Sequence, residues 1–235
     1  MSTVYLDIET VAMSADACAH LMPERLTLTE PTLEMVEAYA DSLPSNWKPD
    51  TRQAKAEAWA STYDGEEERR RWMDDAALDP TRSTIYSYSA IVDGETRVEF
   101  ADELSGEHTL IDYILREVGD GYGTSPAPTV ITWNGHGFDL PFVQARCALL
   151  GRPVPRWKRG RYYLDRFIDA QAEVAGKWGL PYKSRSLDYF LRAFGLEPKV
   201  GSGKDFAGWD RAKQLVYARQ DVEGLKVITE AFGLV

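Results

Sequence analysis

The sequence predicts an α/β fold in which a mixed central sheet is flanked by helices, in one domain that spans residues 1–235. Three observations predict it: strand periodicity at the N-terminus, a β-hairpin signature near the middle, and alternating helical and strand patterns after it. The residues are 44% hydrophobic and 27% charged, which is typical of globular proteins and excludes disorder of the whole chain. A chain of this length buries roughly 70–75% of its unfolded surface, so its core needs neither disulfides nor a structural metal.

The first strand is predicted at residues 3–10, TVYLDIET, where the side chains alternate with a period of two. Val4, Leu6 and Ile8 lie on one face, and Tyr5, Asp7 and Glu9 lie on the other. The two carboxylates are therefore about 7 Å apart along the chain. Because adjacent anions repel, a cation between them would stabilise the pair, and hard oxygen ligands select Mg²⁺ or Mn²⁺. The alternative is an edge strand whose outer face is solvated.

Residues 12–80 are predicted to form an acidic helical insertion after the first strand. They carry 15 Asp and Glu against 7 Lys and Arg, a net charge of −8. Three amphipathic helices are expected, at residues 33–43, 50–62 and 65–78. Tryptophans at 47, 59 and 72 give the segment something to bury, so we expect it to be ordered. Because this charge cannot hold phosphates, we expect the insertion to wall one side of a cleft or to bind a protein partner.

A β-hairpin is predicted next, with strands at residues 84–92 and 96–101 that are joined by an Asp93-Gly94 turn. Helices and strands then alternate to the end of the chain. They are a helix at 107–118, a strand at 129–133, a helix from 140 that Gly151 closes, a strand at 162–169, a helix at 186–195 and a helix at 209–232.

Cysteine usage and hydropathy indicate a soluble, untargeted cytoplasmic protein. Cys18 and Cys147 are too few for a disulfide framework or a zinc site, and we expect them to be buried free thiols. No apolar run approaches the ~18 residues of a membrane span, so no membrane partner is expected.

Two further positions in the second half carry candidate functional carboxylates. Asp139 follows a strand and an Asn-Gly turn and precedes a helix, so its side chain is predicted to be an N-cap, a metal ligand or both. Tyr217 and Asp221 are four residues apart on the C-terminal helix, on the face that continues through Leu225 and Ile228. That face predicts an inward-pointing pair, whereas a surface Tyr beside a solvated Asp is the alternative. Gly224 leaves room for a close approach.

Three segments in this order, DIE, NGHGFD and YARQD, resemble the three motifs of the RNase H-like (DnaQ-like) 3′-to-5′ exonuclease superfamily. Tyr217, four residues before Asp221, matches the tyrosine branch, DEDDy; the histidine branch would need a histidine where Val216 stands. The segments NGHGFDLPF, SLDYFLRAFGLEPK and YARQDVEG are similar to the exonuclease domain of family B DNA polymerases and to related free-standing phage-type exonucleases. The resemblance covers residues 1–11 and 84–232, whereas 12–80 replaces a short connection.

The resemblance implies an RNase H-like fold and hydrolysis assisted by two Mg²⁺ or Mn²⁺ ions roughly 3.5–4 Å apart. It implies that Asp7 bridges both ions, that Glu9 and Asp221 complete the site on the nucleophile side, and that Asp139 holds the second ion. The hydroxyl of Tyr217 would orient the attacking water.

A basic stretch is the candidate strand-binding surface. Residues 146–204 hold 13 Lys and Arg against 5 Asp and Glu, a local charge of +8. We expect the run at 156–166 to guide a phosphate backbone, with Trp157 and its tyrosines as stacking surfaces, although such runs are also typical of solvated faces. The basic residues expected to take part are Arg156, Lys158, Arg159, Lys183, Arg185, Lys199 and Lys204. By resemblance Asn134 and Phe138 touch the 3′ end; a turn residue and a core residue are the alternatives. Asp169 is interpreted as structural.

These features predict a divalent-metal-dependent 3′-to-5′ exonuclease that hydrolyses single-stranded or frayed DNA 3′ ends to mononucleotides. We expect it to be free-standing, because no polymerase region follows Val235. An exoribonuclease of the same superfamily is one alternative. A catalytically silent nucleic-acid-binding module is another, and the presence of all four acids and the tyrosine argues against it.

Overall fold

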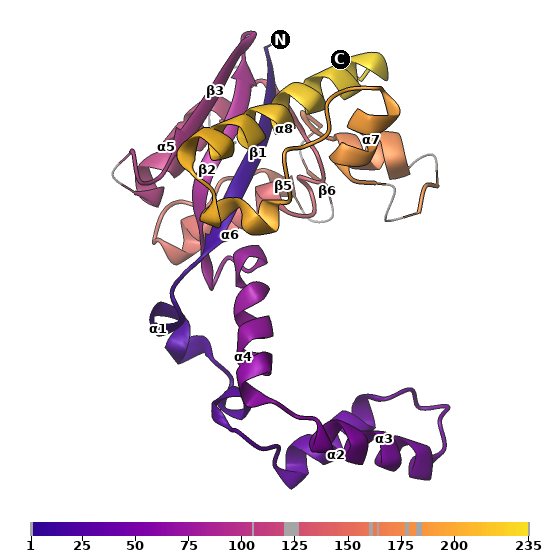
Figure 1. Cartoon of the computed structure of the whole chain (residues 1–235). Helices are drawn as coiled ribbons and strands as arrows, with labels where there is room; N and C mark the ends of the chain where they lie inside the picture. Colours follow the sequence, from indigo (N-terminus) through magenta and orange to yellow (C-terminus); the bar gives the residue numbers. More distant parts are fainter. Residues whose placement is uncertain are drawn as a thin grey trace. The chain divides into compact units, whose positions relative to one another are not determined.

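The structure is a computed structural model of the whole chain (Figure 1), and it describes residues 2–104, 106–119, 127–159, 162–163, 165–176, 179–181 and 185–234. At residues 158, 159, 162 and 163 only the backbone is described. The chain divides into two compact units. Unit 1 comprises Met1–Val11 and Leu78–Val235, and unit 2 comprises Ala12–Ala77.

Unit 1 is built on a five-stranded mixed sheet with the strand order β3-β2-β1-β4-β7. The strands are β1 (Thr3–Ala12), β2 (Ser83–Val92), β3 (Glu95–Phe100), β4 (Thr129–Thr132) and β7 (Phe167–Asp169). β1 pairs with β4 in parallel, β4 pairs with β7 in parallel, and β2 pairs with β3 in antiparallel. The predicted α/β fold with a mixed central sheet is therefore confirmed.

The predicted hairpin is confirmed at its turn. Val92 faces Glu95 in the β2–β3 register, with Asp93 and Gly94 between them. Both turn residues have positive φ, 51° and 84°, which is the left-handed conformation that the shortest hairpin turns require and that Asp-Gly adopts readily.

Alternation along β1 gives the sheet two different faces. Val4, Leu6 and Ile8 belong to a core with the helices α5 (Glu107–Val118) and α6 (Asp139–Leu149). Tyr5 belongs to a second core with α7 (Leu187–Ala193) and α8 (Arg211–Ala231). Asp7 and Glu9 follow Tyr5 with a period of two, so their side chains share the face that α8 covers.

The predicted strand at 162–169 is wrong as one element. Tyr162–Tyr163 form β6, which pairs with β5 (Lys158–Arg159) in a separate two-stranded sheet, and only β7 joins the central sheet beside β4. The hydrophobic pattern does not reveal which strand a segment pairs with, because pairing depends on contacts distant in sequence. Gly151 does close α6, with a φ of 66°, and both cysteines are buried free thiols.

Unit 2 is helical, as predicted. It contains α1 (Ala15–Cys18), α2 (Leu33–Ser42), α3 (Pro49–Ser61) and α4 (Gly65–Asp74), of which the short α1 was not expected. Ser14, Thr32 and Asp64 cap α1, α2 and α4 with side-chain oxygens, and Pro49 begins α3. Within α2, α3 and α4, only Ala56 and Gly65 are buried. No helix in the described part of the chain is long and apolar enough to cross a membrane.

Candidate functional site

Three carboxylates from two elements converge on one point of unit 1. Asp7 and Glu9 extend from β1 and Asp221 from α8, and one oxygen of each lies within 4.8 Å of the others. Strand periodicity places the first two on one face, and the packing of α8 on that face brings the third to them. This group could hold a metal ion.

Asp139 lies beside the group and is 2% exposed, but it is not one of the three residues that converge. Its Oδ1 accepts a hydrogen bond of 3.1 Å from the backbone N–H of Ile8, between the two β1 acids. The predicted N-cap role is wrong, because Asp139 is the first residue of α6 and Phe138, at the cap position, makes no side-chain cap. The carboxylate instead ties the start of α6 to β1.

Tyr217 and Asp221 point inward, as the helical spacing predicted, and are 4% and 2% exposed. The alternative of a surface pair is therefore wrong. The ring of Tyr217 packs against Phe206 and Trp209, with centroids 5.6 and 5.3 Å away. The room beside Gly224 is filled by α7, since a Cβ there would lie 2.7 Å from a methyl group of Leu191.

Lys199 was expected to guide a phosphate backbone, but the structure places it inside this site. Its Nζ lies 2.5 Å from Asp221 Oδ1 and 4.1 Å from the centroid of the Tyr217 ring. Lys199 lies in the irregular segment between α7 and α8, 22 positions before Asp221, so no local periodicity relates the two residues. Its place within a basic stretch was the available signal, and that signal suggested a phosphate contact.

Burial and mutual repulsion raise the pKa values of these carboxyl groups. Burial, followed by the charges of Asp221 and Glu9, raises the pKa of Asp7 well above its ordinary value. Burial and Asp221 do the same to the pKa of Glu9, and burial raises the pKa of Asp139 to about 7. Burial also raises the pKa of Asp221, although Lys199 opposes this shift.

The same surroundings shift the pKa values of Lys199 and Tyr217. Burial alone would lower the pKa of Lys199, but the Asp221 carboxylate raises it above its ordinary value, so the ammonium keeps its charge. Burial and the charge of Asp221 raise the pKa of Tyr217, which keeps its hydroxyl protonated.

The oxygen atoms of this group fit a divalent cation. Asp7 Oδ2 and Asp221 Oδ2 are buried and have no hydrogen-bond partner among the described residues. A buried carboxylate oxygen without a partner is costly, and a hard cation satisfies it. A Cβ on Gly203 would lie 3.2 Å from the Tyr217 hydroxyl and 3.5 Å from Glu9 Oε2, so the backbone at Gly203 approaches the site closely.

The turn between β4 and α6 is held by Asp169, which confirms that residue's structural interpretation. The Asp169 carboxylate accepts hydrogen bonds from the backbone N–H groups of Asn134 (3.0 Å) and His136 (3.1 Å). Asn134 has a φ of 63° and an exposed side chain, and Phe138 is half-buried 5.3 Å from Phe142. The proposed contacts of Asn134 and Phe138 with a 3′ end stay predictions.

The structure places the candidate strand-binding residues in part. Arg156 and Lys204 are exposed, whereas Lys183 and the side chains of Lys158 and Arg159 lie outside the described residues. Trp157 is not a stacking surface. It is fully buried, its Nε1 donates to the carbonyl of Gly119 at 2.5 Å, and its ring packs 5.7 Å from Phe167.

Comparison with known proteins identifies the fold. No family model and no curated protein matches the sequence. Among solved structures, the family B DNA polymerase from the hyperthermophilic archaeon Pyrobaculum calidifontis is similar, with a TM-score of 0.56 and 16% sequence identity. The similarity covers 98% of this chain but only 24% of the polymerase. The fold is RNase H-like.

The RNase H-like sheet explains why motifs far apart in the sequence meet. β1 is the middle strand and β4, which leads into Asp139, is its parallel neighbour. Parallel neighbours carry their next elements to the same end of a sheet, and α8 brings Asp221 across the face. The site is thus assembled by topology, from segments that each bury their own apolar face.

Proposed function

We propose that this chain is a divalent-metal-dependent 3′-to-5′ exonuclease that releases mononucleotides from single-stranded or frayed DNA 3′ ends. The observation that carries the proposal is the convergence of Asp7, Glu9 and Asp221 within 4.8 Å, beside Asp139 and Tyr217, in an RNase H-like fold. The three motifs that predicted these residues are distant in sequence, so their meeting at one point is independent support.

Each residue of the site has a role in this proposal. Asp7, Glu9 and Asp221 would hold one ion, and Asp7 with Asp139 a second. Bound Mg²⁺ or Mn²⁺ supplies a hydroxide nucleophile at neutral pH and neutralises charge on the leaving 3′-oxygen. The Tyr217 hydroxyl, kept protonated by its raised pKa, orients the attacking water. Lys199 offsets part of the negative charge before an ion binds.

The substrate assignment rests on similarity and charge. The similar solved structure is a DNA polymerase, and the basic stretch that contains Arg156 and Lys204 offers cations for a phosphate backbone. Unit 2 carries most of the −8 charge and would not hold the strand, so we propose that unit 1 performs the reaction and that residues 12–80 are an insertion in one exonuclease domain.

The proposal is tested with 3′-labelled linear single strands of DNA and RNA and with internally labelled linear and circular strands, incubated in parallel with and without Mg²⁺ or Mn²⁺. We expect cation-dependent release of labelled mononucleotides from DNA, faster than from RNA, and no cutting of circular strands. Asp7→Asn should abolish release, because it removes a charged ligand and keeps the side-chain shape. Glu230→Gln, which changes an exposed acid on α8, is the matched control and should keep the wild-type rate.

Three outcomes separate the alternatives. Faster release from RNA would favour an exoribonuclease. Equal release from linear and circular strands would rule out a 3′-end requirement. Strand binding without release under any divalent cation would support a catalytically silent module.

A further inference from the structure

Unit 2 contains an open groove lined mainly by apolar and aromatic side chains. The groove has a volume of about 540 Å³ and lies between residues of α2, the end of α3 and α4. Leu26, Met35, Tyr39, Trp59 and Tyr63 line it. This volume is in the range of sites that hold a ligand or the anchoring side chains of a partner.

The aromatic side chains of the groove pack against one another but are not buried. The rings of Tyr39 and Trp59 are stacked at 4.7 Å with an interplanar angle of 9°, and Tyr63 meets Trp59 edge-on at 5.4 Å. All three remain partly exposed. Because α2, α3 and α4 bury only Ala56 and Gly65, most of their apolar surface lacks a partner within unit 2.

The groove continues along α2. A second hollow of about 440 Å³ shares Arg25, Met35 and Ala38 with the first and adds Glu24 and Glu34 to the lining. An elongated site along a helix fits a row of side chains on one face of a partner helix better than it fits a compact small molecule.

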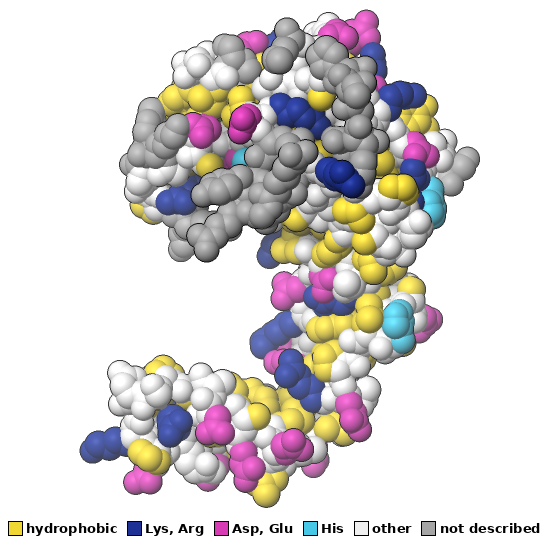
Figure 2. Space-filling view, turned by 180° about the vertical axis from the view of Figure 1, so that it is seen from behind, with side chains coloured by type: hydrophobic (Ala, Val, Ile, Leu, Met, Phe, Trp, Pro, Cys, Tyr) yellow, Lys and Arg dark blue, Asp and Glu magenta, His cyan; other side chains and the backbone are white. Residues whose placement is uncertain are grey.

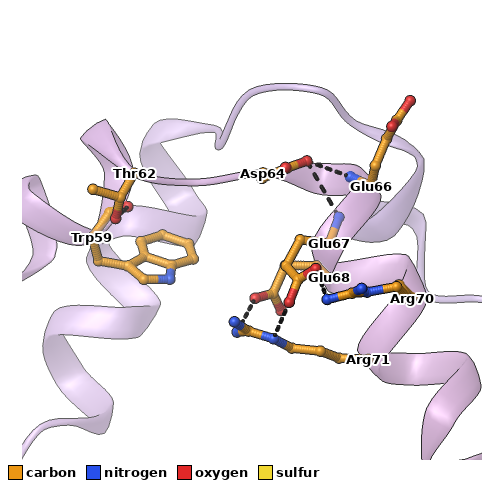
Figure 3. A network of polar contacts seen from close by, with 8 residues as sticks. All are labelled: Trp59, Thr62, Asp64, Glu66, Glu67, Glu68, Arg70 and Arg71. Carbon is orange, nitrogen blue, oxygen red and sulfur yellow. Dashed lines mark hydrogen bonds and ion pairs between the residues drawn. The ribbon is translucent and has the colours of Figure 1, made fainter.

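The charged side chains that line the two hollows are Glu24, Glu34 and Glu68 against Arg25 and Arg71, a net charge of −1. Arg71, the basic residue that α4 places in the lining, is neutralised by Glu67 at 3.0 Å and Glu68 at 3.2 Å, as Figure 3 shows. Glu24 and Glu34 form no ion pair within residues 12–77, all of which the structure describes. Figure 2 shows acidic, basic and hydrophobic side chains close together on the visible face of unit 2, in the lower part of the view.

The charge of unit 2 and the residue types that line the groove together indicate the class of partner. Residues 12–77 carry 14 acids against 7 bases, which repels a phosphate backbone and attracts cations. Tyr, Trp, Met and Arg, the residue types that protein interfaces favour, form the lining. We propose that the groove binds an amphipathic helical segment of a partner protein, whose apolar side chains fill the Tyr39–Trp59 region and whose Lys and Arg face the acidic rim.

The proposal is tested on the full chain by fluorescence anisotropy with a designed probe. The probe is a fluorescein-labelled peptide of about 18 residues, long enough to form a helix, with Leu and Trp at helical spacing on one face and Lys on the other. The control peptide carries Glu in place of each Lys. We expect binding of the basic peptide in the micromolar range that weakens as salt is added, and at least about tenfold weaker binding of the acidic one.

Two sets of variants locate the binding. Trp59→Ala should weaken binding of the basic peptide at least about tenfold, because the central aromatic contact of the groove is lost. Trp47→Ala, which changes an exposed tryptophan outside the groove, should not. The double variant Glu24→Lys, Glu34→Lys changes two exposed side chains and keeps the fold testable if Trp59→Ala perturbs α3; it should also weaken binding.

Several results would overturn the proposal. Equal binding of both peptides, or binding unchanged in Trp59→Ala and in the double variant, would show that the groove does not select a basic helix. A concentration-dependent dimer that Trp59→Ala abolishes in sedimentation would assign the groove to a second copy of this chain. A labelled DNA strand whose binding Trp59→Ala removes would assign it to nucleic acid.

Discussion

At the scale of single residues, the site balances four acids against one lysine. Lys199 contacts Asp221 at 2.5 Å with 17% of its side chain exposed, so water screens the pair only partly. A divalent cation that bound Asp221, as proposed, would take over the role of the lysine charge. Lys199 would then stabilise the metal-free protein and compete with the ion.

We predict that Lys199→Met destabilises the metal-free protein and strengthens cation binding. The variant keeps most of the stem that packs on Tyr217 but removes the charge, and an uncompensated buried acid costs on the order of 3 kcal/mol. Urea unfolding without cation and calorimetric titration of Mn²⁺, both at pH 8, measure the two effects. Lys226→Met, which changes a more exposed lysine on α8, is the matched control. Equal losses in the two variants would contradict the prediction.

We predict that Tyr217→Phe lowers turnover while the fold and cation binding persist. The ring contacts with Phe206 and Trp209 remain, and the lost hydroxyl is the group proposed to position water. Positioning and proton transfer are worth about 10²–10⁴-fold, and we expect the low end or less because other donors partly hold the water. Single-turnover rates measure the effect. Tyr86→Phe, which removes a hydroxyl that contacts Asp102, is the control, and unaltered turnover in Tyr217→Phe would remove the tyrosine-branch assignment.

Residue identities were predictable from sequence where local periodicity decides them. The inward direction of Tyr217 follows from its spacing to Leu225 and Ile228, which are both buried. Asp139 and Lys199 are different, because their partners, Ile8 and Asp221, are set by tertiary contacts. A helix start with Asp favours a cap locally, and only the neighbouring strand offers the competing N–H group.

At the scale of elements, the turn that leads into α6 depends on one acid at the end of β7. Asp169 is 6% exposed and accepts three backbone N–H groups, from Asn134, His136 and Ala172. These bonds hold the turn against the end of the neighbouring strand. The position of Asp139 at the start of α6 therefore depends on a side chain outside the cluster of Asp7, Glu9 and Asp221.

We predict that Asp169→Ala and Asp169→Asn both lower stability and activity below those of the wild type. The loss should be larger for Asp169→Ala. Asp169→Ala leaves buried N–H groups without acceptors and should cost on the order of 3 kcal/mol of the free energy of unfolding, whereas Asn keeps one carbonyl oxygen. Thermal unfolding and nuclease rates measure the series. Asp165→Ala changes an exposed acid and should have no effect; an Asp169→Ala protein of wild-type stability would contradict the prediction.

Some elements could be predicted because residues close in sequence determine them, whereas others depend on contacts between distant segments. The hairpin and α5 lie within a residue or so of their predicted ranges, because turn chemistry and helical period act over a few positions. The predicted strand at 162–169 contains two short runs of strand-forming residues, Tyr162–Tyr163 and Phe167–Ile168, but these runs pair with different strands. The groove of unit 2 was not predictable, since it arises from how three helices leave their apolar sides open.

At the scale of the whole molecule, the buried carboxyl groups make stability fall as pH rises. Their folded pKa values are raised, to about 7 for Asp139, above ordinary unfolded values near 4. Between those two pH values the folded state holds protons that the unfolded state has released, so the free energy of unfolding decreases. Asp79, Asp102 and Asp188 have lowered pKa values, and their stabilisation is complete above about pH 4.

We predict that the melting temperature of the metal-free chain falls from pH 5 to pH 8, and that Mg²⁺ or Mn²⁺ restores more of it at pH 8 than at pH 5. Deprotonation creates both the repulsion and the ligands, so cation binding and stability are linked. Asp139→Asn removes one titrating group and should flatten the slope. Calorimetry over this range measures it, and a melting temperature that rises with pH would contradict the prediction.

The hydrogen bond from Ile8 to Asp139 makes a backbone amide into a spectroscopic reporter. The Ile8 N–H lies between Asp7 and Glu9 in the chain and donates to the Asp139 carboxylate, whose pKa burial raises to about 7. Its nitrogen and proton chemical shifts depend on the charge of that acceptor. A single cross-peak in a two-dimensional NMR spectrum of ¹⁵N-isoleucine-labelled protein therefore records, without substrate and without a variant, whether the Asp139 carboxyl group holds its proton at a given pH.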